Sequence, residues 1–209
     1  MPDLTTLLLF LGAALVLALS PGPGMFYVAA RSLGAGRREG VLSSLGTGVG
    51  GMAHVLAGAL GVSALVLASA ELFTLLKVAG ALYLFWLGWR TFRGAASGLD
   101  LAATGAAPAR PFREGMVVEA LNPKTAAFFL AFLPQFVDPA AGSVLWQFVL
   151  LGSFCVALNT GVDLFVALLA GRLREGLFTR PRLLLRLRQG SGAAIAALGL
   201  GVLLIRRPT

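Results

Sequence analysis

Two proline-containing breaks interrupt strongly apolar segments at matching places in this chain. The first is Ser20–Gly24, with the sequence SPGPG, and the second is Asn122–Lys124, with the sequence NPK. At a constant offset of 102 residues, Pro21 falls on Pro123. Proline within a helix removes a backbone donor and clashes with the preceding turn, and lipid cannot satisfy the carbonyl that loses its partner. Such breaks must therefore face protein or a water-filled cavity, and their matching positions are typical of a transporter's binding site.

The composition places these segments in a membrane. Hydrophobic residues make up 57% of the chain and charged residues 12%, with a mean hydropathy of +0.86, whereas soluble domains carry about 25% charged residues. The net charge is +8, but the arginines lie between apolar runs, which favours loops beside anionic lipid over a nucleic-acid surface. We therefore expect the lipid bilayer as a partner and no nucleic acid. Cys155 is the only cysteine, so no disulfide or thiol pair can form.

We predict an all-α membrane protein with six transmembrane helices, because about 20 helical residues cross the apolar core of a bilayer. The first and fourth helices carry the proline breaks. The last span is short and could begin earlier, near Pro181. The predicted spans are Leu4–Ala30, Val41–Ala68, Leu72–Trp89, Gly115–Val137, Val144–Ala170 and Gly190–Ile205.

The six spans divide into two three-helix repeats. Residues 1–94 form the first repeat, residues 95–111 a small, flexible cytoplasmic linker, and residues 112–209 the second repeat. Because three is odd, the two repeats insert with opposite orientation. Arginines concentrate between spans one and two, three and four, and five and six, so the positive-inside rule makes these loops cytoplasmic and puts both termini outside. Arg206 and Arg207 then lie on the wrong side, which leaves their placement open.

The predicted substrate pathway consists of the two breaks. At the first break, the two prolines strip hydrogen bonds from the carbonyls of Leu17 and Leu19, and the glycines let a ligand approach the backbone. The half-helix that begins near Pro23 points free N–H groups into the gap. The alternative is a simple kink, which membrane helices tolerate. The pathway residues are Ser20, Pro21, Gly22, Pro23, Gly24, Asn122, Pro123 and Lys124.

The second break repeats this arrangement. Pro123 frees the carbonyl of Glu119, and Asn122 can cap the half-helix that follows. Lys124 could attract a substrate carboxylate. Alternatively, its side chain snorkels to the interface or pairs with Glu119.

Five polar residues are candidates for a proton or polar relay: Asp163, Asn159, His54, Thr47 and Glu119. Asp163 lies in an apolar run, and intramembrane acids usually mark an ion or proton path; the alternatives are a structural partner for Lys124 or a buried hydroxyl. His54, the only histidine, lies two turns after Thr47 and is either a relay or a hydrogen-bonded packing residue. Glu119 faces either the cavity or the interface.

The motifs as a whole resemble the lysine exporter (LysE/RhtB) family. The resemblance rests on SPGPGMFYVAARSLGAGRREG, GVGGMAHVLAG, LYLFWLGWRTFRG and FREGMVVEALNPKTAAFFLAFLPQFVDP. That family comprises threonine, homoserine, lysine, arginine and leucine efflux proteins of the bacterial inner membrane. The resemblance implies a multi-pass secondary transporter that exports amino acids or related small metabolites, driven by the proton motive force. It does not fix the substrate.

Other function classes fit less well. An intramembrane enzyme would need a clustered nucleophile and base, whereas His54 and Asp163 are isolated, so we predict no catalytic residues and no enzyme. A divalent-cation exporter would need several inward-facing acids, and only Asp163 and Glu119 qualify, so we predict no metal site and no cofactor. A cation exporter and a non-transporting membrane subunit stay as alternatives. A homo-oligomer is left open.

Overall fold

The computed structural model describes residues 4–68, 70–94 and 110–172, together with residues 182, 185, 186, 189, 190, 193, 195–197 and 200. These described residues form helices joined by short turns, and no strand occurs among them. The helices are α1 (Leu4–Leu19), α2 (Pro23–Ala35), α3 (Arg37–Ala68), α4 (Ala70–Arg93), α5 (Pro111–Ala120), α6 (Pro123–Ala127) and α7 (Val144–Arg172).

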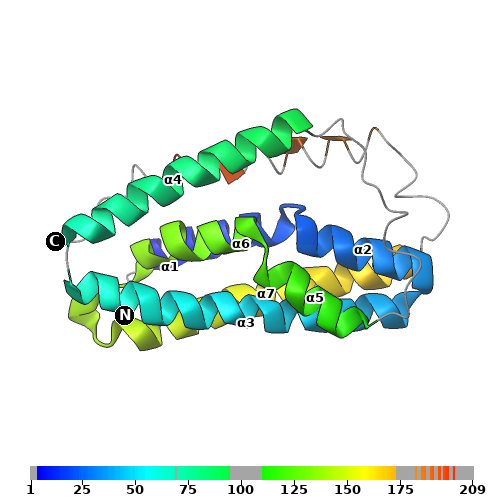
Figure 1. Cartoon of the computed structure of the whole chain (residues 1–209), viewed down its shortest axis with the longest axis horizontal. Helices are drawn as coiled ribbons and strands as arrows, with labels where there is room; N and C mark the ends of the chain where they lie inside the picture. Colours follow the sequence, from blue (N-terminus) through cyan, green and yellow to red (C-terminus); the bar gives the residue numbers. More distant parts are fainter. Residues whose placement is uncertain are drawn as a thin grey trace.

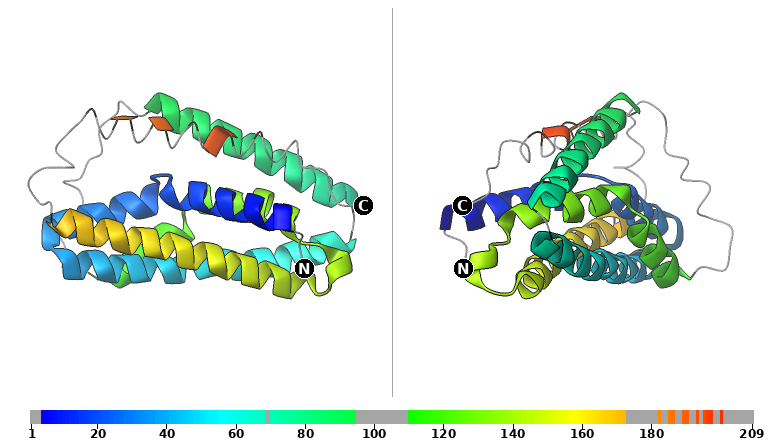
Figure 2. Two further views of the ribbon diagram at one scale, coloured as in Figure 1. Left: turned by 180° about the vertical axis from the view of Figure 1, so that it is seen from behind. Right: turned by 60° about the vertical axis from the view of Figure 1, so that its left-hand side comes forward.

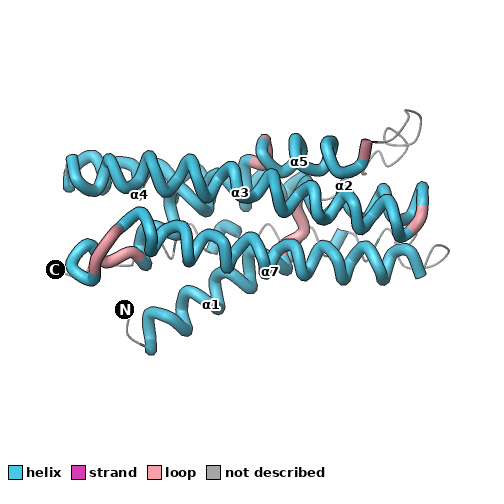
Figure 3. Tube along the Cα trace, turned by 90° about the horizontal axis from the view of Figure 1, so that it is seen from below, coloured by secondary structure: helices cyan, strands magenta, loops and turns pink. Residues whose placement is uncertain are grey.

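The two long helices α3 and α7 run side by side along the whole bundle, as Figures 1 and 3 show, and α5 packs along α3. Glycines on α3 allow α5 to pack closely against it. A Cβ atom on Gly46 would overlap the backbone carbonyl of Phe112, and one on Gly50 would overlap the carbonyl of Met116. The glycine-rich second span thus packs tightly against α5, as small residues allow in membrane helices.

The helix α4 lies at an angle beside the other helices in Figures 1 and 2. It packs on α6 and on the π-helical segment Phe128–Phe132 that follows α6. At this contact Gly80 makes room for the side chain of Ala131, and Leu84 is buried against Ala127 and Ala131. The second break and its π-helical continuation are therefore held between α4 and the rest of the bundle.

An aromatic core fixes the chain after the second break against α1. The Phe132 ring lies 5.0 Å from both the Phe128 ring and the Phe136 ring, and the Phe10 ring of α1 lies 5.4 Å from Phe136. Burying each of these rings contributes a few kcal/mol. Phe136 belongs to a 3-10 turn, Leu133–Phe136, and a second such turn, Pro139–Ala141, leads to α7.

The outer surface is apolar, as expected for helices in lipid. Many large side chains are exposed on α1, α3, α4 and α7, among them Leu8, Leu60, Leu75, Leu150 and Phe165. Trp86 and Trp89 are exposed near the end of α4, and Trp146 is exposed near the start of α7.

Both predicted helix breaks are confirmed. The axes of α1 and α2 differ by 45°, and those of α5 and the helix after Pro123 differ by 42°. Among the described residues, α3 and α7 are long and apolar enough to cross a membrane alone, and the count rises to four if each bent pair is one span. The third predicted span corresponds to α4. The linker and the sixth predicted span fall largely outside the described residues, so the six-helix repeat stays a prediction.

Candidate functional site

The two breaks meet inside the bundle, where Lys124 reaches from the second break to the first. Its side chain is only 6% exposed. Its Nζ atom donates a hydrogen bond to the carbonyl of Ser20 at 2.8 Å and another to the carbonyl of Leu17 at 3.2 Å. The carbonyls of Leu17 and Leu19 were predicted to lose their partners at this break. Lys124 donates to the Leu17 carbonyl, but its second acceptor is the Ser20 carbonyl and not that of Leu19. Lys124 neither snorkels nor forms an ion pair with Glu119 among the described residues.

The glycines of the first break make room for side chains of the second. A Cβ atom on Gly22 would lie 3.0 Å from Cε of Lys124. A Cβ atom on Gly24 would overlap a carboxylate oxygen of Glu119. The close approach that glycine permits is used here by Lys124 and Glu119, so the breaks interlock. The Ser20 hydroxyl donates to the carbonyl of Val16 at 2.6 Å within its own helix.

Asn122 caps the second break, as its sequence position predicts. Its Oδ1 atom accepts a hydrogen bond from the backbone N–H of Lys124 at 3.0 Å, and its Nδ2 atom donates to Oε2 of Glu119 at 2.9 Å. Thr125 donates its hydroxyl proton to the other oxygen, Oε1, of Glu119 at 2.6 Å. Each carboxylate oxygen of Glu119 thus holds one donor from the residues beside Pro123.

The carbonyl that Pro123 frees has two partners in the structure. The Glu119 carbonyl accepts the backbone N–H of Asn122 at 2.9 Å, and Nε2 of His54 lies 2.8 Å from it. Because a carbonyl only accepts, His54 donates through Nε2. Its ring also stacks on Phe129, at 6.2 Å between centroids. This is the geometry that the packing interpretation of His54 expects.

Asp163 and Thr47 lie together, on α7 and α3. The Asp163 side chain is 1% exposed, and Oγ1 of Thr47 lies 3.0 Å from its Oδ2 atom. The same hydroxyl lies 2.8 Å from the carbonyl of Ser44. The structure therefore pairs Thr47 with Asp163 and not with His54, its neighbour on α3. No ion pair joins Asp163 to Lys124 in the part of the chain that the structure describes.

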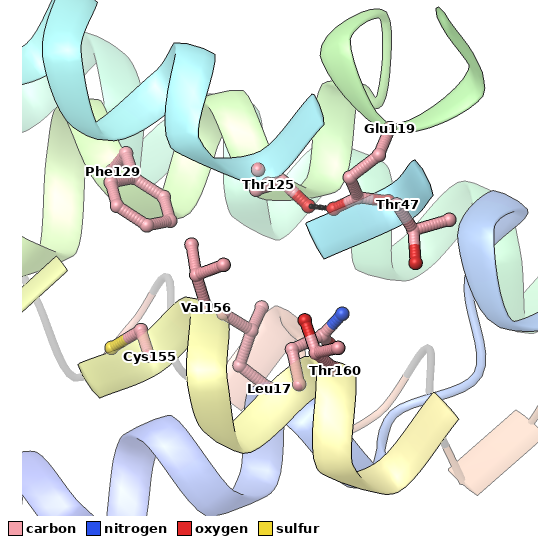
Figure 4. Close-up of a pocket in the computed structure, with 10 residues that line it drawn as sticks. Leu17, Thr47, Glu119, Thr125, Phe129, Cys155, Val156 and Thr160 are labelled. Carbon is pink, nitrogen blue, oxygen red and sulfur yellow. Dashed lines mark hydrogen bonds between the residues drawn. The ribbon is translucent and has the colours of Figure 1, made fainter. Parts of the chain in front are cut away.

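A small cavity lies beside the interlocked breaks, and Figure 4 shows its lining. One part of the lining is polar and one part is apolar. In Figure 4 the apolar Phe129, Cys155 and Val156 lie toward the left, and Thr47 and Glu119 lie toward the right. The polar lining residues are Thr47, Glu119, Thr125, Asn159 and Thr160. The others are Leu17, Gly51, Phe129, Cys155 and Val156.

The structure thus brings the pathway residues of both breaks together and sets Thr47, Asn159 and Glu119 on the wall of one cavity. Thr125, which donates a hydrogen bond to Glu119, was not among the residues predicted from the sequence. Its position directly after Asn122–Lys124 is the sequence feature that could have predicted this contact. Gly51 and Val156, which come together across α3 and α7, were not predicted either.

A second polar cluster lies where α2 ends and α3 and α5 begin. Arg31 is 6% exposed, and its guanidinium lies 3.4 Å from the carboxylate of Glu39 and 4.0 Å from that of Glu114. The Tyr27 hydroxyl lies 2.9 Å from the Glu114 carboxylate and 3.2 Å from the carbonyl of Pro111. Arg31, one of the arginines between the first two predicted spans, is thus buried and paired with two carboxylates. Its spacing from Tyr27, one helical turn, was the signal in the sequence.

Comparisons with known proteins identify the family of this chain. Residues 15–207 match the model of the LysE type translocator family. An uncharacterized membrane protein of Vibrio cholerae is 33% identical, with 97% of each chain covered. The homoserine/homoserine lactone efflux protein of Salmonella typhimurium is 34% identical, with 78% of this chain and 80% of the relative covered. The leucine efflux protein of an Enterobacter strain is 30% identical over 67% of each chain. No solved structure matches the chain.

The family match covers nearly the whole chain, and the relatives are bacterial membrane and efflux proteins. Two expectations from the sequence are thereby confirmed: the protein is a transporter and not an enzyme, and it is a multi-pass protein of the bacterial inner membrane. The chain belongs to the LysE type translocator family.

Proposed function

We propose that this protein exports amino acids or related small metabolites from the cytoplasm, and that the interlocked breaks bind the substrate. Relatives named for the efflux of homoserine and leucine support the substrate class. The observation that carries the proposal is the contact of Lys124 with the carbonyls of Leu17 and Ser20. These carbonyls already hold one ammonium group, so they can hold another.

The charge of Lys124 favours an anionic partner. A buried ammonium is costly unless it is paired and hydrogen-bonded, and among the described residues no carboxylate lies within ion-pair distance of it. A zwitterionic amino acid meets both needs. Its ammonium replaces that of Lys124 at the Leu17 and Ser20 carbonyls, and its carboxylate pairs with the Lys124 ammonium that it displaces.

The position of this contact suits alternating access. Lys124 belongs to the proposed second repeat, and its two acceptors belong to the first. The α1–α2 pair and the α5–α6 pair run in opposite directions through the bundle in Figure 1, as inverted repeats would. Rocking one repeat against the other would then open the shared site to either side of the membrane.

Asp163 is the residue that we propose for proton coupling. The Thr47 hydroxyl has one proton and lies near two acceptors, Oδ2 of Asp163 and the Ser44 carbonyl. If Asp163 is ionised, Thr47 donates to it. If Asp163 is protonated, it donates to Thr47, which then donates to Ser44. Asp163 can therefore hold or release a proton and keep its hydrogen bond with Thr47 in both states, which supports coupling to the proton motive force.

Counterflow in proteoliposomes tests this function. Purified protein is reconstituted into vesicles loaded with a high concentration of one unlabelled amino acid, and uptake of the labelled amino acid is measured. We expect uptake above that of protein-free vesicles for at least one amino acid, and faster uptake under a pH gradient. We also expect cells that lack the protein to be more sensitive to an excess of that amino acid. The absence of uptake for every amino acid tested would reject the proposal.

A further inference from the structure

The cavity beside the breaks has a feature that the amino and carboxylate groups of a substrate do not explain, namely its apolar part. Leu17 connects the two regions, because its carbonyl accepts Lys124 and the residue also lines the cavity. Phe129, Cys155 and Val156 continue the apolar lining away from the polar residues, as Figure 4 shows. A group attached to an ammonium at the Leu17 carbonyl therefore has an apolar space beside it.

The acids near this space lie toward its polar part, where Glu119 and Thr47 line the cavity. Both carboxylate oxygens of Glu119 hold donors, from Asn122 and Thr125, and Asp163 contacts Thr47. A basic side chain placed among Phe129 and Val156 would be a buried charge without a partner, which is strongly unfavourable. The apolar part of the cavity therefore excludes charged side chains.

The width of the cavity is set where α3 meets α7. Gly51 faces Val156, and a Cβ atom on Gly51 would lie 3.1 Å from Cγ2 and 3.4 Å from Cγ1 of Val156. The space is small, and most of its lining residues are buried. A long side chain would have to displace these neighbours, whereas a short one would not.

We infer that this cavity selects amino acids with a short, uncharged side chain, and that Gly51 and Val156 set the longest side chain accepted. This inference rests on the proposed function, because it concerns the side chain of the same substrate. An added or missing methylene group in an apolar pocket typically changes discrimination by about 10-fold to 200-fold. Substitutions at the two positions should therefore move the length limit in opposite directions.

Counterflow with a graded series tests this inference, with glycine, alanine, 2-aminobutyrate, norvaline and norleucine as substrates and lysine as the charged comparison. We expect uptake to fall steeply beyond one chain length, with lysine excluded. Val156→Ala should raise uptake of the first excluded member relative to alanine by about tenfold. Gly51→Ala should lower uptake of the longest accepted member relative to alanine by a similar factor.

Two matched variants control for indirect effects. Gly61→Ala lies on the same helix as Gly51, at a site where an added Cβ meets nothing within 4 Å among the described residues. Val49→Ala truncates an exposed valine on α3. Both should leave the length limit unchanged. If amino acids are carried but Val156→Ala leaves the limit in place, or if lysine is carried as well as alanine, the inference is wrong and the proposed function stands. If no amino acid is carried, both are wrong.

Discussion

The two helix breaks resemble each other in sequence and in one backbone hydrogen bond, because the carbonyl freed by each proline accepts the N–H three residues later. They differ in the second partner of that carbonyl. At the first break, the Leu17 carbonyl receives the backbone N–H of Ser20 at 3.2 Å and the Lys124 ammonium, a charged group at the end of a flexible side chain from the other broken helix pair. At the second break, the Glu119 carbonyl receives the backbone N–H of Asn122 and the ring of His54. The first break therefore holds a partner that can leave, and the second is closed by its own residues and by α3.

This difference indicates a division of roles. The first break supplies backbone acceptors and, through Gly22 and Gly24, the space around them. The second break supplies side chains, above all Lys124 and the Glu119 carboxylate. A site with a replaceable cation on backbone acceptors is suited to binding another cation, whereas the capped second break is suited to holding Lys124 in position.

Removing the charge of Lys124 should have the largest effect. In Lys124→Met the substrate carboxylate has no partner, and losing one member of a buried charged pair costs roughly 3 kcal/mol, or about 100-fold in affinity. We expect counterflow at low substrate concentration to fall by about that factor. Arg90→Met, which removes an exposed cation stacked on Trp86, should leave transport unchanged. Normal transport by Lys124→Met would remove the basis for the substrate site.

The two prolines should differ in their effects. In Pro21→Ala a new backbone N–H can donate to the Leu17 carbonyl and displace Lys124 from it, so we expect transport to fall by about tenfold or more. In Pro123→Ala the new N–H competes with His54 at the Glu119 carbonyl, outside the ammonium site, so the loss should be smaller. Pro139→Ala, in an exposed turn, is the control. Unchanged transport in both break variants would mean that the breaks are only kinks.

Asp163→Asn should separate coupling from binding. The amide keeps the shape of the carboxyl group but does not take up a proton. We expect uptake driven by a pH gradient to be abolished and counterflow exchange to persist in part. Thr47→Ser keeps the hydroxyl beside Asp163 and should retain coupling, whereas Thr47→Val should weaken it. Undiminished pH-driven uptake in Asp163→Asn would assign coupling to another group.

The smallest effect is expected at the polar cluster between α2 and α5. Tyr27→Phe removes one hydrogen bond to Glu114, which is worth about 1 kcal/mol. The melting temperature of the purified protein in detergent should fall slightly, while substrate selectivity stays the same. Phe92→Leu, at an exposed aromatic position on α4, is a comparison outside the cluster. A changed side-chain length limit in Tyr27→Phe would contradict the assignment of selectivity to Gly51 and Val156.

The features that sequence analysis predicted are those with local causes. Proline and glycine act on their own backbone, so the breaks at Ser20–Gly24 and Asn122–Lys124 and the Asn122 cap could be located without a structure. The partners across the bundle could not. The choice of Ser20 over Leu19 as an acceptor, the Thr47–Asp163 contact and the burial of Arg31 depend on how α1, α3 and α7 pack, and helix spacing alone does not determine this.

The central claim is that an amino acid replaces the Lys124 ammonium at the first break and that Lys124 then pairs with its carboxylate. Ligand-induced stabilisation of the purified protein tests it most directly, using the best-transported amino acid, its decarboxylated amine and its deaminated acid. We expect the amino acid to raise the melting temperature well above either analogue, and its effect in Lys124→Met to fall to that of the amine. Equal stabilisation by the amine and the amino acid in the unaltered protein, or an undiminished effect in Lys124→Met, would contradict the claim.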